Sequence, residues 1–319
     1  MKIHVNFNIE VSRLKKVIQI VLVLFITFLT GCKYITPTNQ GDANKPKNEI
    51  YLQIMTTNKL VYYMVQDIVK EQDYVDYMFS NEADQWNFQF TQDSIDNVSK
   101  QDLFFYAGAG FEPWANDFIS KLKKDSVGVV NLSRGAVLLP YKKEVKYKGT
   151  ILTDNPYYWL NLDNYKVDML NIKNAIEEKD PENRDYYDKN FSDAIELIDV
   201  QSKKLNDITQ KSKDYIYLVD GEELDYFIEY NNFNSLNLSD YNSFTLNQKD
   251  EKAIFEKKLI DAKGIIFLYK SEKELKSNET LIKKYKMKVA NIKAYSANLS
   301  FSEIITMDVA NLERVLGTN

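Results

Sequence analysis

The fold is decided by the segment DPENRDYYDKNFSDAIELIDVQSKKLNDITQKSK, residues 180–213. Asp180 suits an N-cap, Pro181 suits the first helical position, and Glu182 places negative charge in the first turn, where the helix dipole favours it. No glycine and no further proline interrupts the segment up to Lys213. A helix of about 30 residues would span ~45 Å, which is longer than a small domain is wide. We therefore predict one long helix over 181–213 that joins two lobes, with a surface helix of a single domain as the alternative.

Segments typical of β-strands lie on both sides of this helix. These short apolar runs are residues 50–55, Leu103–Tyr106, 127–132, Tyr215–Val219 and Gly264–Tyr269. After the first run, residues 56–58 offer capping side chains, and residues 59–70 form an amphipathic pattern with Leu60, Met64 and Ile68 on one face. Strands that alternate with helices in this way predict βαβ units and parallel sheets.

The predicted fold class is α/β, with two Rossmann-like lobes of mainly parallel sheet joined by one long backbone helix. The N-terminal lobe is expected to span residues 50–180, the inter-lobe helix 181–213 and the C-terminal lobe 214–319. The chain of 319 residues is long enough to form two domains of ordinary size.

The first 32 residues have the pattern of a bacterial lipoprotein signal peptide. Basic residues between positions 2 and 16 precede an apolar run over 17–28, and small residues then lead to Cys32. The run is shorter than the ~20 apolar residues of a stable membrane span, so a transmembrane anchor or buried helix is the weaker alternative. We predict a signal peptide over 1–31, lipidation of Cys32 and a flexible tether over 32–49. The protein would be exported and anchored to the outer face of the cell membrane.

The composition excludes several function classes. The only histidine is His4 and the only cysteine is Cys32, so the chain after the signal peptide has no imidazole and no free thiol for nucleophilic catalysis. The formal net charge of −5 argues against nucleic-acid binding. Residues 108–110 do not begin a dinucleotide motif, because Pro113 stands where the third glycine would be. We expect neither enzymatic activity nor a cofactor.

Two motifs resemble those of a known family. They are DLFFYAGAGFEPW at 102–114, and PYYWLNLDN at 156–164 followed by DPENRDYY at 180–187. Both resemble segments of the zinc- and manganese-binding lipoproteins of ABC importers, which include adhesin-type lipoproteins, and the resemblance runs from about residue 50 to 316. It implies a monomeric solute-binding protein with its ligand site in a cleft between the lobes. It also implies a membrane permease and an ATPase as partners.

The positions that match the family's metal ligands carry no histidine in this chain. The resemblance places the candidate cleft residues at Trp86, Tyr157, Gly221, and Tyr295 with Ser296. Zinc sites are built from cysteine sulfur, histidine nitrogen and carboxylate oxygen, so we predict a degenerate site without high affinity for zinc. The aromatic residues would either line a pocket for a small organic solute or fill the former metal cavity.

Two alternatives to solute import remain open. The chain would be a surface adhesin or interaction lipoprotein if it kept the fold without transport. It would bind a hard divalent cation if carboxylate oxygens converge, and the candidate ligands for such a site are Asp84, Asp154, Asp220 and Glu222. Charged side chains are mostly exposed, so solvated or capping roles are the simpler expectation for these four acids.

Overall fold

The structure is a computed structural model that describes residues 51–122, 127–243 and 248–317. The predicted signal peptide at 1–31, Cys32, the tether at 32–49 and the first residue of the strand predicted at 50–55 lie outside these ranges. All described residues belong to one compact unit. Within them, no helix combines the length and the apolar character that a membrane span requires.

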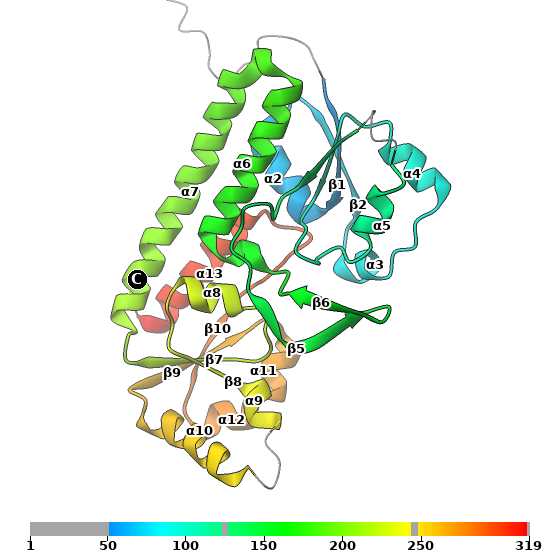
Figure 1. Ribbon diagram of the computed structural model, residues 1–319. Helices are drawn as coiled ribbons and strands as arrows, with labels where there is room; N and C mark the ends of the chain where they lie inside the picture. The colour runs from blue at the N-terminus through cyan, green and yellow to red at the C-terminus, as the bar shows by residue number, and fades with distance from the viewer. Residues whose placement is uncertain (1–50, 123–126, 244–247, 318–319) are drawn as a thin grey trace, which may run out of the picture. The chain divides into compact units, whose positions relative to one another are not determined.

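The N-terminal lobe is built on a parallel sheet of four strands in the order β2-β1-β3-β4 (Figure 1). The strands are β1 (Gln53–Asn58), β2 (Tyr74–Phe79), β3 (Leu103–Tyr106) and β4 (Gly128–Asn131). Its helices are α2 (Lys59–Val69), α3 (Glu82–Trp86), α4 (Gln92–Val98) and α5 (Ala115–Ile119). The Asn58 side chain accepts a hydrogen bond from the Val61 amide and starts α2, as the sequence predicts. The strand before it begins and ends three residues later than predicted, because β1 pairs with β2 as far as Asn58.

The C-terminal lobe repeats this design with the strand order β10-β9-β7-β8. The strands are β7 (Tyr215–Val219), β8 (Ser235–Asn237), β9 (Gly264–Tyr269) and β10 (Lys288–Asn291). Its helices are α8 (Asp225–Tyr230), α9 (Leu238–Ser243), α10 (Lys249–Asp261), α11 (Glu272–Ser277), α12 (Glu279–Lys284) and α13 (Phe301–Leu316). A capping box between Ser300 and Glu303 starts α13, which packs against both α7 and α2. The predicted fold class, two parallel α/β lobes and a long connecting helix, is confirmed.

The long helix α7 (Arg184–Lys211) connects the two lobes and forms a hairpin with α6 (Leu162–Lys179) (Figure 1). The sequence predicts its position, but the α-helix begins later than Pro181, because residues Pro181–Asn183 form a 3₁₀ turn, η2. Helix α6 was not predicted. The buried residues of α7 recur every three or four positions, as expected for a helix that packs along one side: Tyr186, Tyr187, Asn190, Ala194, Ile198, Gln201, Leu205 and Ile208.

The role predicted for Asp180 as an N-cap is wrong. Its side chain accepts no backbone amide; instead it is buried, and Oδ2 accepts hydrogen bonds from Asn183 Nδ2 at 2.7 Å and from the Tyr187 hydroxyl at 2.8 Å. The same hydroxyl lies 3.1 Å from Oδ2 of Asp73, and Asp73 Oδ1 accepts from the Leu52 amide. One phenolic hydrogen therefore serves two carboxylates where α7 meets the N-terminal sheet.

The burial of the Asp73 carboxyl group makes stability depend on pH. Burial raises the pKa of Asp73 from its ordinary 3.8 to about 6. A raised pKa in the folded state means that protonation of Asp73 stabilises the folded protein. This contribution is fully present below pH ~4 and is lost as the pH rises through about 6. Asparagine at position 73 cannot ionise. After allowance for solvent screening, we therefore expect Asp73→Asn to be more stable than the parent protein by about 1 kcal/mol at pH 8. At pH 4 the two proteins should have nearly equal stability.

Urea unfolding at both pH values measures this difference. Asp76→Asn, on the exposed side of β2, is the matched control. An Asp73→Asn effect of the same size at pH 4 and pH 8 would contradict the assignment of the titration to Asp73.

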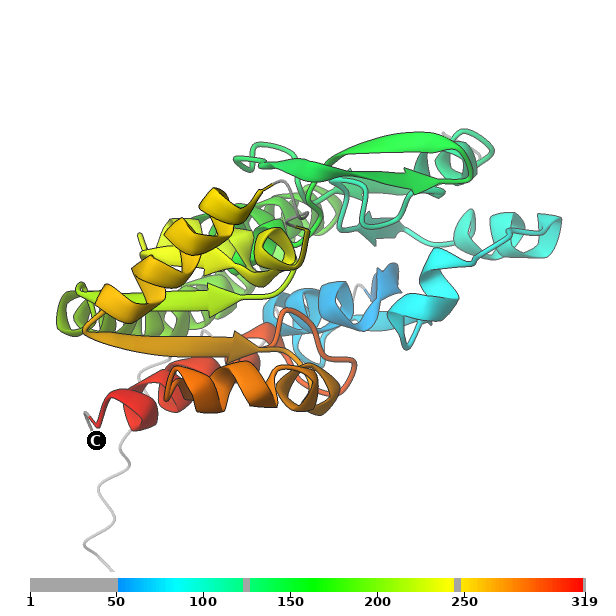
Figure 2. The same ribbon diagram turned by 90° about the horizontal axis from the view of Figure 1, so that it is seen from below.

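An antiparallel hairpin, which was not predicted, lies alongside both lobes. It consists of β5 (Pro140–Tyr147) and β6 (Thr150–Asp154), and its turn residues Lys148 and Gly149 both have positive φ, as a tight hairpin turn requires. Figure 2 shows this hairpin on one side of the lobes and α13 on the other. The 3₁₀ turn η1 (Tyr158–Leu160) follows the hairpin and leads into α6.

Candidate ligand-binding cleft

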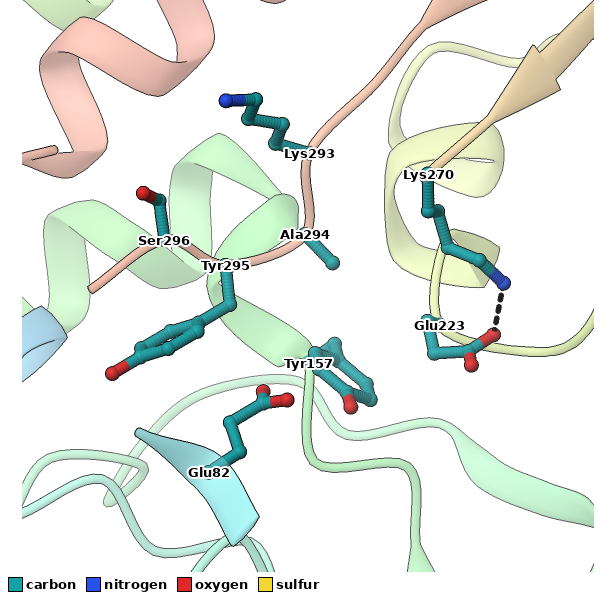
Figure 3. A pocket seen from close by; sticks show the side chains of 8 residues that line it. All are labelled: Glu82, Tyr157, Glu223, Lys270, Lys293, Ala294, Tyr295 and Ser296. Carbon is teal, nitrogen blue, oxygen red and sulfur yellow. Dashed lines mark hydrogen bonds and ion pairs between the residues drawn. The ribbon is translucent and has the colours of Figure 1, made fainter. Parts of the chain in front are cut away.

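The segments that follow the strands of both sheets meet around one cavity. Ligands of parallel α/β folds bind beyond the carboxyl ends of the strands, and the segments after β2, β7, β9 and β10 come together in this way. The cavity has a volume of about 410 Å³ (Figure 3). Its walls are Glu82, Tyr157, Glu223, Lys270, Lys293, Ala294, Tyr295 and Ser296.

Two further hollows adjoin this cavity at Tyr157, which lines all three. One, of about 440 Å³, lies beside α3 and includes Trp86 and Phe111. The other, of about 310 Å³, lies against the hairpin and includes Gly221 and Glu222. The three hollows form one cleft arranged around the Tyr157 ring.

Glu82 is one of the four charged residues that line the main cavity. The Asn81 side chain accepts from the Asp84 amide and so starts α3 directly after β2, which places Glu82 in its first turn. In Figure 3 the Glu82 carboxyl group points between the rings of Tyr157 and Tyr295. Its Oε1 atom is buried and has no hydrogen-bond partner in the described part of the chain. Burial, together with the nearby Glu223 carboxylate, raises the pKa of Glu82.

The second carboxylate of the cavity is already paired. Lys270 Nζ lies 2.7 Å from Glu223 Oε2 and donates to the Asp220 carbonyl oxygen at 2.5 Å, which ties the end of β9 to the loop after β7. Gly221 has φ +94°, and a β-carbon there would collide with the Glu223 carboxylate. The Lys270 charge is thus neutralised within the protein. The Lys293 side chain extends away from Glu82 in Figure 3.

The aromatic walls rest on Phe111, which lies in the loop after β3. Its ring centroid is 6.0 Å from that of Tyr157 and 6.1 Å from that of Tyr295. Burial raises the pKa of the Tyr157 and Tyr295 phenols far above their ordinary value, and the nearby Glu82 carboxylate adds to the effect on both. Both side chains are therefore neutral phenols at physiological pH.

The residues proposed from the sequence are distributed over the whole cleft. Tyr157, Tyr295 and Ser296 line the main cavity. Of the three hollows, Trp86 lines the one beside α3, and its ring packs edge-on against Tyr147 with centroids 5.3 Å apart. Gly221 lines the hollow beside the hairpin.

Sequence reasoning did not place four charged residues of the main cavity among the cleft candidates: Glu82, Glu223, Lys270 and Lys293. The weak signal for Glu82 is that it follows Asn81, a good helix N-cap, after a strand that we did not predict. The signal for Lys270 is its position directly after the predicted strand Gly264–Tyr269.

The four acids considered as oxygen ligands do not come together. Each accepts a local or cross-lobe hydrogen bond: Asp84 from Asn81 Nδ2, Asp154 from the Thr153 hydroxyl, Asp220 from the Ser239 hydroxyl, and Glu222 from the Lys142 and Lys143 amides. Within residues 51–122, 127–243 and 248–317, no group of three or more His, Cys, Asp or Glu side chains could hold a metal ion.

Comparison with known proteins places most of this chain in one sequence family. The family described as zinc-uptake complex component A, periplasmic, matches residues 54–313. The manganese ABC transporter substrate-binding lipoprotein PsaA of Streptococcus pneumoniae is 26% identical over 206 residues, which cover 62% of this chain and 64% of that protein. A metal ABC transporter substrate-binding lipoprotein of Lactococcus lactis is 25% identical over 206 residues, 62% and 59% of the two chains. The match thus spans less than two thirds of the length of these relatives, whose names describe binding proteins rather than enzymes.

Solved structures share the fold at low sequence identity. A crystal structure of ZnuA aligns with a TM-score of 0.61 at 16% identity and covers 84% of this chain and 99% of that one. The metal-dependent lipoprotein YcdH of Bacillus subtilis aligns with a TM-score of 0.62 at 18% identity, covering 82% and 98%. A mutant of the laminin-binding adhesin of Streptococcus agalactiae aligns with a TM-score of 0.62 at 20% identity, covering 84% and 99%. These structures support the two-lobed fold.

Proposed function

Because the chain belongs to the family of the periplasmic zinc-uptake complex component A, we propose that it is the solute-binding component of an ABC importer whose cleft no longer binds zinc tightly. The observation that carries this proposal is the composition of the cleft. Its main cavity is lined by carboxylates, phenols and lysines, and the chain has no histidine or cysteine after Cys32. Zinc sites depend on imidazole or thiolate ligands, so the fold has kept the cleft without the zinc ligands.

The proposed organisation follows the sequence. The segments are a signal peptide at 1–31, a lipidated Cys32, a tether at 32–49, lobes at 50–180 and 214–319, and an inter-lobe helix at 181–213. Two acyl chains on the N-terminal residue would give stable anchoring at the outer face of the membrane. A monomer on such a tether would deliver its solute to a permease powered by an ATPase.

Contacts across the cleft support small movements of the lobes rather than wide opening. Trp159 Nε1 donates to the Ala294 carbonyl oxygen at 2.9 Å, and the Tyr226 hydroxyl lies 3.0 Å from the Asn155 carbonyl oxygen. Residues of both lobes also share the main hydrophobic cluster. Because this core is continuous, full separation of the lobes would expose apolar surface to water.

Metal titration tests the proposal. We expect the purified, chelator-stripped protein to show no one-to-one binding of Zn²⁺ or Mn²⁺ at sub-micromolar concentration by calorimetry, because no imidazole or thiolate lines the cleft. The manganese-binding lipoprotein of Streptococcus pneumoniae, treated in the same way, is the positive control. Sub-micromolar binding of either ion by this chain would overturn the proposed loss of the metal site.

A further inference from the structure

We propose that the cleft binds a small organic solute through a protonated primary amine, held by the Glu82 carboxylate between the rings of Tyr157 and Tyr295. This inference rests on the proposed function and names the solute class of the same site. It follows from the charge of the Glu82 carboxylate, from the direction of the side chains around it and from a buried acceptor for which the described part of the chain supplies no donor.

The first argument is charge. Glu223 is paired with Lys270 at 2.7 Å, whereas Oε1 of Glu82 is buried without a hydrogen-bond partner in the described part of the chain. A buried carboxylate oxygen that lacks a donor costs free energy, and a donor of positive charge offsets that cost most effectively. The group that completes this cavity should therefore be a cation that carries a hydrogen-bond donor.

The second argument is the direction of the aromatic side chains. In Figure 3 the Glu82 carboxyl group points between the two tyrosine rings, and the Tyr295 hydroxyl group points away from it. A metal ion would need several oxygens converging on one point. Ring surfaces beside a carboxylate suit an organic cation instead, because the face of an aromatic ring attracts positive charge.

The third argument separates the kinds of organic cation. A quaternary ammonium group would gain the ring contacts, but it has no N–H and would leave Glu82 Oε1 without a donor. A primary ammonium group donates a hydrogen bond and keeps the ring contacts. The cavity of about 410 Å³ lies within the size range of small-molecule sites, and Ser296 and Lys293 supply polar groups for the rest of the solute.

The test is a matched panel of ligands applied to the purified protein in detergent. The primary amines are putrescine, spermidine, tyramine and butylamine, and butan-1-ol and butyltrimethylammonium are the neutral and quaternary counterparts of butylamine. We expect at least one primary amine to raise the melting temperature and to bind in calorimetry, and the neutral and quaternary counterparts to have no comparable effect.

Two variants locate the binding. Glu82→Gln keeps the shape of the side chain and removes its charge, and it should weaken amine binding by about tenfold or more, since a hydrogen bond between charged groups is lost. The variant should fold, because burial already raises the pKa of the Glu82 carboxyl group. The neutral amide of glutamine therefore suits this environment at least as well as the charged carboxylate does. Asp84→Asn, on the same short helix but outside the cavity walls, should bind as the parent does.

The proposal is overturned if no primary amine binds, if the neutral counterpart binds equally well, or if Glu82→Gln retains full affinity. Binding of ferric ion through the tyrosines, seen as a visible absorption band, would also overturn it. A Zn²⁺ titration of the same samples separates the two proposals. Tight zinc binding would refute the proposed loss of the metal site, whereas absence of both zinc and amine binding would refute only the amine inference.

Discussion

Replacing Trp159 with alanine is expected to lower the free energy of unfolding by about 4 kcal/mol, the middle of the range for truncation of a buried aromatic residue. Trp159 is fully buried in the main hydrophobic cluster. Its ring lies 4.8 Å from that of Phe111, and its Nε1 donates to the Ala294 carbonyl oxygen in the segment after β10. The variant would therefore lose packing in one lobe and a hydrogen bond to the other. Urea unfolding measures the loss.

Trp159→Phe separates these two contributions. Phenylalanine retains much of the apolar volume but has no N–H, so the Ala294 carbonyl oxygen would lose its donor. We expect a loss of about 1–2 kcal/mol for this variant. A loss as large as that of Trp159→Ala would show that the hydrogen bond between the lobes dominates. A loss below about 1 kcal/mol for Trp159→Ala would refute the central packing role of this residue.

The central parallel strands were the most predictable part of the fold. Leu103–Tyr106, Tyr215–Val219 and Gly264–Tyr269 were predicted at the residues where the structure has them. These central strands are covered on both faces, so nearly every side chain in them is apolar, and the run is visible without any alternation. The long helix was predicted for a different reason, because no glycine interrupts its helical pattern.

The β5–β6 hairpin and helix α6 were not predicted, and each omission has a physical reason. Half of the side chains of strand β5 are charged and most are exposed, and the backbone amides of Lys142 and Lys143 donate hydrogen bonds to Glu222 from the other lobe. Such a contact joins residues about eighty positions apart, so it cannot be predicted from a local sequence pattern. Helix α6 has a weak apolar face because its buried side includes the polar residues Asn164 and Asp168.

The candidate site was only partly visible in the sequence. The resemblance to the family pointed to Tyr157 and Tyr295, which line the main cavity, but it gave no reason to select Glu82. Glu82 lies beside these tyrosines because β2 ends at Phe79 and Asn81 turns the chain into α3. Sequence motifs identify positions, whereas the charge of a cavity depends on which distant segments the fold brings together.

Replacement of Glu112 by alanine is the second substitution expected to have a large effect, a loss of about 4 kcal/mol in the free energy of unfolding. Glu112 is fully buried, and its carboxylate accepts hydrogen bonds from four donors. These donors are the Thr57 hydroxyl, Asn58 Nδ2 and the backbone amides of Ala107 and Gly108. Alanine would leave all four donors buried without this acceptor.

Glu112→Gln tests whether the carboxylate itself is required. A glutamine oxygen can replace Oε1, which accepts from Thr57, Asn58 and Ala107, but its NH₂ group would then face the Gly108 amide, donor against donor. We expect a loss of about 1–2 kcal/mol for this variant. Asp117→Asn, an exposed acid in α5, is the control and should change stability by less than about 0.5 kcal/mol.

The result bears on the cleft as well as on stability, because Glu112 holds the loop that carries Phe111. The Phe111 ring supports both Tyr157 and Tyr295, with centroids 6.0 and 6.1 Å away. If the Glu112 carboxylate fixes the position of Phe111, Glu112→Gln should weaken ligand binding in the cleft, although residue 112 does not line the main cavity. A Glu112→Ala variant as stable as the parent would mean that the four donors find other acceptors, and the loop after β3 would then owe its conformation to glycine and packing alone.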